Sequence, residues 1–131
     1  MEILDSTLRE GEQTPGISFT IDQKVAIAKR LDAFGVDFIE LGHPAVSPDV
    51  YEAVAILNDL NLNTKKIAHG CASKSDINDV AAIGVGWMGI FFGTSPLSLK
   101  HKFNMTKSDA LAQIETAVKY GKDKGLHLRF T

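Results

Sequence analysis

Apolar residues along this chain follow two alternating patterns. Short runs of consecutive apolar residues are typical of strands buried on both faces, and stretches with an apolar position every three or four residues are typical of amphipathic helices. The runs predict five strands, at residues 3–4, 38–41, 66–68, 87–92 and 126–130. A helix is predicted in each of the four intervals between them.

Local signals place the ends of these helices. Each one follows a residue whose hydroxyl group can cap the first turn, namely Thr20, Ser47, Ser73 and Thr106. Gln23 completes a capping box with Thr20, and Pro48 suits the first helical position after Ser47. Glycines at positions 35, 84 and 125 stand where three of the helices should end. The apolar faces should carry Val25, Ala28 and Leu31 in the first helix and Leu111, Ile114 and Val118 in the last.

The alternation of strands and helices predicts an α/β fold of parallel strands joined by right-handed crossovers. Two architectures fit this pattern, an open doubly wound sheet and part of a (β/α)8 barrel. A complete barrel takes roughly 250 residues, so four βα units and a fifth strand make about half of one. The length of 131 residues alone favours the open sheet.

Charge and composition narrow the choice of partners. The chain has 14 basic and 16 acidic residues and a net charge of −2, so we expect no nucleic-acid partner. No apolar run reaches the roughly 20 residues of a membrane span. Cys71 is the single cysteine, which excludes an internal disulfide and fits a reducing cytoplasm. We expect it to be a small, partly buried residue.

Polar side chains follow every predicted strand. Because the carboxyl ends of parallel strands meet at one edge, these residues should share one site. In chain order they are Asp5, Arg9, Glu10 and Gln13, then Glu40 and His43, then His69, then Thr94 and Ser95, and finally Arg129 and Thr131.

The densest group lies in residues 4–13, where an arginine stands beside an acid after a short strand. A guanidinium group can stabilise a developing oxyanion, and a neighbouring carboxylate can hold a divalent cation. This pair could therefore bind an oxoacid. A solvated, salt-bridged turn explains the same charges without any ligand.

Residues 5–13, D-S-T-L-R-E-G-E-Q, resemble the opening signature of the Claisen-condensing TIM-barrel family. This family contains the isopropylmalate, citramalate and homocitrate synthases, with hydroxymethylglutaryl-CoA lyase as a more distant relative. The resemblance implies the N-terminal half of a TIM barrel, with residues 1–131 as one partial catalytic domain that stops within the fifth strand. It reverses the preference for an open sheet.

Two further motifs resemble the homocitrate branch of the family: Ile67-Ala68-His69-Gly70 and Gly42-His43-Pro44. That branch implies an acyltransferase of lysine biosynthesis by the aminoadipate route, which condenses acetyl-CoA with 2-oxoglutarate and uses a divalent metal, Mg, Mn or Zn. One alternative is a 2-isopropylmalate or citramalate synthase. Another is a non-catalytic half-barrel that associates with a partner.

The resemblance also implies roles for single residues. Arg9 would stabilise the keto and enolate oxygens, and Glu10 would be a metal ligand. Glu40 would be costly to bury without a partner, so we expect it to pair with Arg9 as a catalytic residue. The substrate-binding residues would be Arg9, Gln13, His69, Arg129 and Thr131. No residue is a convincing general base. The turn after the first strand would be organised by Asp5, and we expect structural roles for His43, His101 and His127.

The family completes its metal site with an H-x-H pair, and this sequence contains none. One carboxylate does not hold a divalent ion firmly. We therefore expect the isolated 131 residues to bind the family's metal poorly and to be inactive. The resemblance separately implies that the full-length protein is a homodimer, as its relatives are.

Overall fold

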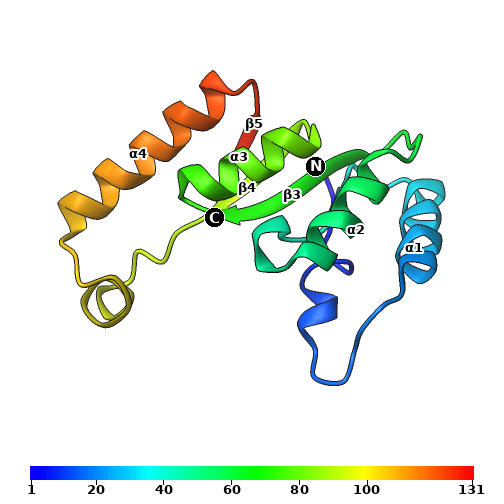
Figure 1. Cartoon of the computed structure of the whole chain (residues 1–131), viewed down its shortest axis with the longest axis horizontal. Coiled ribbons are helices and arrows are strands. Elements are labelled where there is room, and N and C mark those ends of the chain that lie inside the picture. Colours follow the sequence, from blue (N-terminus) through cyan, green and yellow to red (C-terminus); the bar gives the residue numbers. More distant parts are fainter.

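The computed structural model describes residues 1–131 and shows four major helices around a five-stranded sheet (Figure 1). The strands are β1 (Leu4–Asp5), β2 (Phe38–Glu40), β3 (Lys65–Cys71), β4 (Trp87–Phe91) and β5 (His127–Phe130). The α-helices are α1 (Ile21–Phe34), α2 (Pro48–Asn58), α3 (Lys74–Ile83) and α4 (Lys107–Asp123). Short helical segments are η1 (Gly11–Gln13), η2 (Pro44–Val46) and the π-helical η3 (Ser98–Phe103).

The strand order decides between the two predicted architectures. All strands are parallel and follow one another in the order β1-β2-β3-β4-β5. A doubly wound sheet reverses its strand order at a switch point, and this sheet does not. Right-handed crossovers that always advance in one direction leave every helix on the same face, which is how a (β/α)8 barrel is built. The half-barrel prediction is confirmed.

The helix signals were mostly correct. Thr20 and Gln23 form a capping box at the start of α1, and Gly35 ends that helix with a φ of 88°. The hydroxyl groups of Ser47, Ser73 and Thr106 each accept a hydrogen bond from a backbone N–H in the first turn of α2, α3 and α4.

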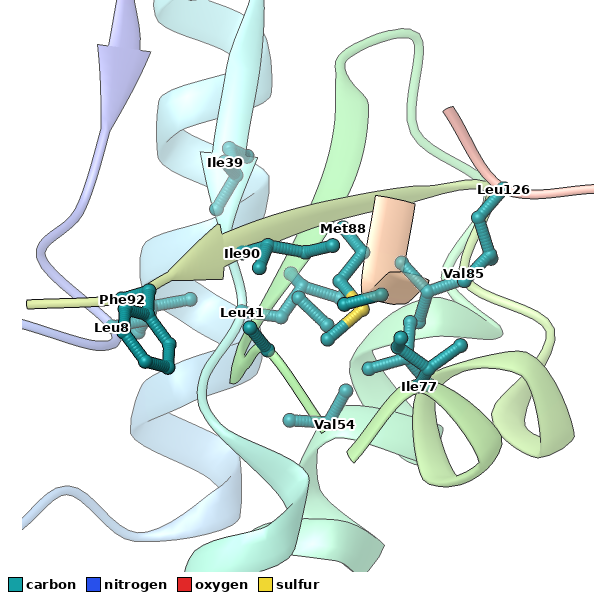
Figure 2. Packing of buried hydrophobic residues seen from close by; sticks show 14 of the residues in the cluster. Leu8, Ile39, Leu41, Val54, Ile77, Val85, Met88, Ile90, Phe92 and Leu126 are labelled. Atoms are coloured by element: carbon teal, nitrogen blue, oxygen red, sulfur yellow. The ribbon is translucent and has the colours of Figure 1, made fainter. Parts of the chain in front are cut away.

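The main core lies between the sheet and the helices. Each helix contacts the next one along the chain, and in Figure 1 α2 and α3 lie over β3 with α1 and α4 at opposite ends. The strands contribute alternate residues to this layer. Figure 2 shows Met88 of β4 between Val54 of α2 and Ile77 of α3, with Ile90 and then Ile39 of β2 farther from these two helices. Burial of these side chains provides the main driving force for folding.

The opposite face of the sheet is concave in a barrel and carries the other set of alternate residues. Phe38 packs edge-on against Trp87 with ring centroids 5.0 Å apart, and Trp87 stacks on His127 at 4.7 Å. The stacking agrees with a structural role for His127. Lys65 Nζ lies 4.8 Å from the centroid of the Phe38 ring. This aromatic row lies toward the amino ends of the strands, away from the polar residues at the carboxyl ends.

Three sequence predictions need correction. β3 covers residues 65–71, longer than predicted, because Lys65 pairs with β2 and residues 69–71 pair with β4. Leu111 does not face the core and is 55% exposed. The buried face of α4 instead carries Ala110, Ala117 and Gly121, whose small size lets the helix approach β5 closely. Cys71 is exposed because it ends its strand.

None of the helices combines the length and the apolar character that crossing a membrane requires.

Candidate active site at the carboxyl ends of the strands

The turn after β1 is held by its own backbone and by one buried anchor. The carbonyl oxygen of Ser6 accepts hydrogen bonds from the N–H groups of Arg9, Glu10 and Gly11, at 3.1, 2.8 and 3.3 Å. Asp5 Oδ1 accepts the N–H of Thr7 at 2.9 Å, so this carboxylate organises the turn as predicted. Because Leu8 is only 1% exposed, the turn cannot swing freely.

Arg9 projects from this turn onto the end of β2. Its Nε donates a hydrogen bond to Glu40 Oε2 at 2.9 Å, and its guanidinium group also pairs with the Glu10 carboxylate. Glu40 is completely buried. His69, on β3, places Nδ1 3.3 Å from Glu40 Oε1. Three consecutive strands therefore bring together four of the predicted site residues.

The surroundings of Glu40 keep its charged form. Burial by itself would raise the pKa of this carboxyl group, but the nearby His69 and the hydrogen-bonded, positively charged Arg9 lower the pKa by more than burial raises it. The net result is a pKa below the ordinary value of 4.5, so Glu40 is a carboxylate at neutral pH. Its charge balances that of Arg9.

One oxygen of this carboxylate remains without a directed hydrogen bond. Glu40 Oε1 is buried and the contact from His69 Nδ1 is too poorly directed to satisfy it. Gly89, on β4, lies beside it, since a Cβ atom at this position would be 3.7 Å from Oε1 and 3.6 Å from His69 Nδ1. The absence of a side chain at Gly89 therefore leaves space next to the Glu40 carboxylate and the His69 imidazole.

The same glycine separates His69 from Arg129. In the sheet register His69 is opposite Gly89, and Gly89 is opposite Arg129. The His69 imidazole and the Arg129 guanidinium group therefore belong to residues two strands apart, whose backbones are separated by about 10 Å. Gly89 itself contributes no side chain between them, and the ring of Phe91, two residues further along β4, lies 6.3 Å from the His69 ring. A ligand with a carboxylate at each end could lie across this gap.

The remaining predicted residues are less closely linked to the cluster. Gln13 and Thr131 are exposed, and neither they nor Arg129 forms a side-chain hydrogen bond or ion pair with Arg9, Glu40 or His69. Gln13 lines a cleft of about 580 Å³ between η1 and the N-terminal ends of α1 and α2. Thr131 is held by its backbone, whose N–H donates to Ile90 O at 2.9 Å.

The metal expected from the resemblance can be tested against the donors that this chain offers. The Glu10 carboxylate is 59% exposed at the edge of the cluster, with Arg9 as its neighbour. Its place suits a ligand, but no second carboxylate, imidazole or thiol joins it in a metal-binding group. Glu10 would be one ligand of such a site.

Two polar pairs near the cluster were not predicted. Glu12 accepts a hydrogen bond from Lys24 Nζ at 2.7 Å, and the Lys24 side chain is only 8% exposed. Lys24 lies four residues before Ala28, so the two residues share one face of α1. This spacing could have predicted that Lys24 is buried and needs an acidic partner. His43 Nε2 lies 2.8 Å from Asp76 Oδ2, which links the end of β2 to the first turn of α3. No sequence signal connects these two residues.

The family model described as HMGL-like matches residues 1–131. The chain belongs to the HMGL-like family. Among its curated relatives, the homocitrate synthase of Pyrococcus abyssi is 50% identical over 98% of this chain and 36% of that protein. The homocitrate synthase of Saccharolobus islandicus is 47% identical over 98% of this chain and 29% of that protein. The chain thus spans about a third of the length of these relatives.

Solved structures of HMGL-like proteins confirm the fold. The HMG-CoA lyase of Bacillus subtilis matches with a TM-score of 0.79 at 17% identity, over 98% of this chain and 45% of the lyase. The HMG-CoA lyase of Brucella melitensis matches with a TM-score of 0.78 at 20% identity, over 98% of this chain and 47% of that lyase. At these identities the likeness concerns the fold alone.

Proposed function

We propose that this chain is the N-terminal part of a homocitrate synthase, an acyltransferase that condenses acetyl-CoA with 2-oxoglutarate in the aminoadipate route of lysine biosynthesis. The observation that carries this proposal is the cluster of Arg9, Glu40 and His69 on three consecutive strands. The identity of about 50% to curated homocitrate synthases supports the choice within the family.

The chemistry of the cluster suits an oxoacid substrate. The guanidinium group of Arg9, oriented by Glu40, would donate to the keto oxygen and stabilise negative charge that develops there. The substrate would lie over Gly89, with one carboxylate toward Arg129 and Thr131. His69 would donate to the second carboxylate of 2-oxoglutarate, which an apolar-tailed oxoacid lacks.

Glu10 is the residue that would contribute to a divalent metal site. When bound, a metal of this kind polarises the carbonyl group of the oxoacid and makes it electrophilic. We propose that the other ligands come from residues outside 1–131. On this proposal the 131 residues alone are inactive, and the complete protein is a homodimer.

The test is a substrate comparison with the complete protein. Homocitrate synthase activity predicts the highest kcat/KM with 2-oxoglutarate, followed at a distance by 2-oxoisovalerate and pyruvate. The release of coenzyme A from acetyl-CoA can be measured with a thiol reagent for all three. A preference for 2-oxoisovalerate would instead assign a 2-isopropylmalate synthase, and a preference for pyruvate a citramalate synthase.

A further inference from the structure

Outside the proposed oxoacid site, three metal-ligating side chains converge from different elements. His43 precedes η2, Cys71 ends β3, and Asp76 lies in the first turn of α3. One ligand atom of each, an imidazole nitrogen, the thiol sulfur and a carboxylate oxygen, lies within 4.8 Å of the other two. No other group of three histidine, cysteine or acidic residues in the chain meets in this way.

Two of the three ligands are already held in place. Asp76 Oδ1 accepts a hydrogen bond from Ser73 Oγ at 2.5 Å, and Asp76 Oδ2 accepts the N–H of Cys71 at 2.9 Å. Outer hydrogen bonds of this kind orient carboxylates in metal sites. The ring of His43 packs edge-on against that of His69, with centroids 5.6 Å apart. The side chain of Cys71 is exposed and can turn to complete the group.

We infer that His43, Cys71 and Asp76 form a zinc site with a fourth position open to water. A thiolate with an imidazole favours zinc over magnesium or calcium, which take oxygen ligands. Around a tetrahedral zinc ion the three ligand atoms would lie roughly 3.3 to 3.7 Å apart. His43 Nε2 and Asp76 Oδ2, now 2.8 Å apart, need to separate only slightly, while the Cys71 sulfur moves inward.

Two charged groups act on the Cys71 thiol. Burial and the neighbouring Asp76, whose carboxylate would repel a thiolate, raise the pKa of this thiol, and the positive charge of Lys102 lowers it by less. A bound zinc ion removes this repulsion and stabilises the thiolate. The hydrogen bond between His43 and Asp76 explains the position of those two residues without a metal. It does not explain why the one cysteine of the chain lies beside them.

The site is separate from the proposed ligand Glu10 and does not depend on the proposed reaction. Its ligands come from the loop after β2, from β3 and from α3, whereas Glu10 lies in the turn after β1. Since His43 contacts His69, zinc bound here would fix the ring that packs against the oxoacid site. The inference therefore adds a second, independent metal position to this half of the barrel.

Cobalt and zinc titrations of the chain test the inference. One Co²⁺ ion should bind per chain and give a thiolate-to-cobalt charge-transfer absorption in the near ultraviolet. This absorption should disappear when Zn²⁺ displaces the Co²⁺ ion. Cys71→Ser should abolish this absorption, and both Cys71→Ser and His43→Gln should weaken zinc binding at least tenfold in competition with a chromophoric chelator. His101→Gln, at an exposed position of η3, is the matched control and should bind zinc like the parent chain.

Three results would overturn the zinc site. The first is the absence of charge-transfer absorption in the parent chain. The second is normal zinc affinity in His43→Gln, or lost affinity in the control His101→Gln. The third is dimerisation on addition of metal, which would indicate that Cys71 residues of two chains share the ion. Circular dichroism checks that each variant is folded. If His43→Gln does not fold, the zinc affinity of Cys71→Ser, a substitution at an exposed position, decides whether the site exists.

Discussion

Arg9 Nε lies 2.9 Å from Glu40 Oε2, and this contact joins the turn after β1 to the end of β2. The glutamate is fully buried, whereas the arginine side chain is 20% exposed and faces the open end of the sheet. A buried carboxylate without a cationic partner would be strongly destabilising. The pair therefore serves stability and also fixes the direction in which the guanidinium group presents its remaining donors.

Glu40→Gln should destabilise the chain by about 3 kcal/mol, because it leaves the Arg9 charge without its partner. Urea unfolding followed by circular dichroism measures this loss. Glu52→Gln, at an exposed position of α2, is the control and should change the unfolding free energy by less than about 0.5 kcal/mol. Equal stability of the two variants would show that the buried pair contributes nothing.

The same pair predicts how stability depends on pH. Since the pKa of Glu40 is lowered on folding, its contribution is fully present above the unfolded value of about 4.5 and is lost as the pH falls through the folded pKa. The difference in unfolding free energy between the parent chain and Glu40→Gln should therefore be constant from pH 5 to 7 and shrink below that range. A difference that grew on acidification would contradict the lowered pKa.

His69→Leu in the complete protein should raise the KM for 2-oxoglutarate at least tenfold and leave the KM for acetyl-CoA within about twofold. The substitution removes the imidazole donor to the second carboxylate of 2-oxoglutarate and leaves the other substrate-binding residues unchanged. Steady-state kinetics with each substrate varied in turn provide the measurement. His101→Leu is the matched control, and an unchanged KM for 2-oxoglutarate would remove His69 from the oxoacid site.

Gly89→Leu should abolish oxoacid binding without unfolding the chain. A Cβ atom at Gly89 meets only ordinary contacts at 3.6 to 3.8 Å, so Gly89→Ala should fold, and the longer side chain should fill the gap between His69 and Arg129. Isothermal titration of the complete protein with 2-oxoglutarate measures the loss. Gly121→Ala, buried against Leu128 on the far side of the sheet, should cost stability but not affinity.

Much of the fold could be predicted because its signals are local. Capping by Thr20 and Ser47, and the glycine at the end of α1, depend only on neighbouring residues. Leu111 was misplaced because spacing alone cannot say which of two adjacent stripes faces the sheet. In α4 the small residues Ala117 and Gly121 took that position, since they allow the close approach to β5.

Only those site residues could be predicted that follow a predicted strand or belong to the signature of residues 5–13. The pairing of Glu40 with Arg9 was predicted from the cost of burying an unpaired acid. The gap over Gly89 was missed because a glycine within an apolar strand does not indicate what its missing side chain exposes. The contact between His43 and Asp76 depends on how β2 and α3 meet across 33 residues of sequence, which no local pattern records.

The uninterrupted strand order means that this part of the site is synthesised in one continuous stretch of the chain. Arg9, Glu40 and His69 stand on successive strands, so every contact among them closes within the stretch that ends with β3 at Cys71. No side chain that follows Cys71 takes part in these contacts. While the ribosome is still adding β4, α4 and β5, the nascent chain already holds the residues that pair the buried acid.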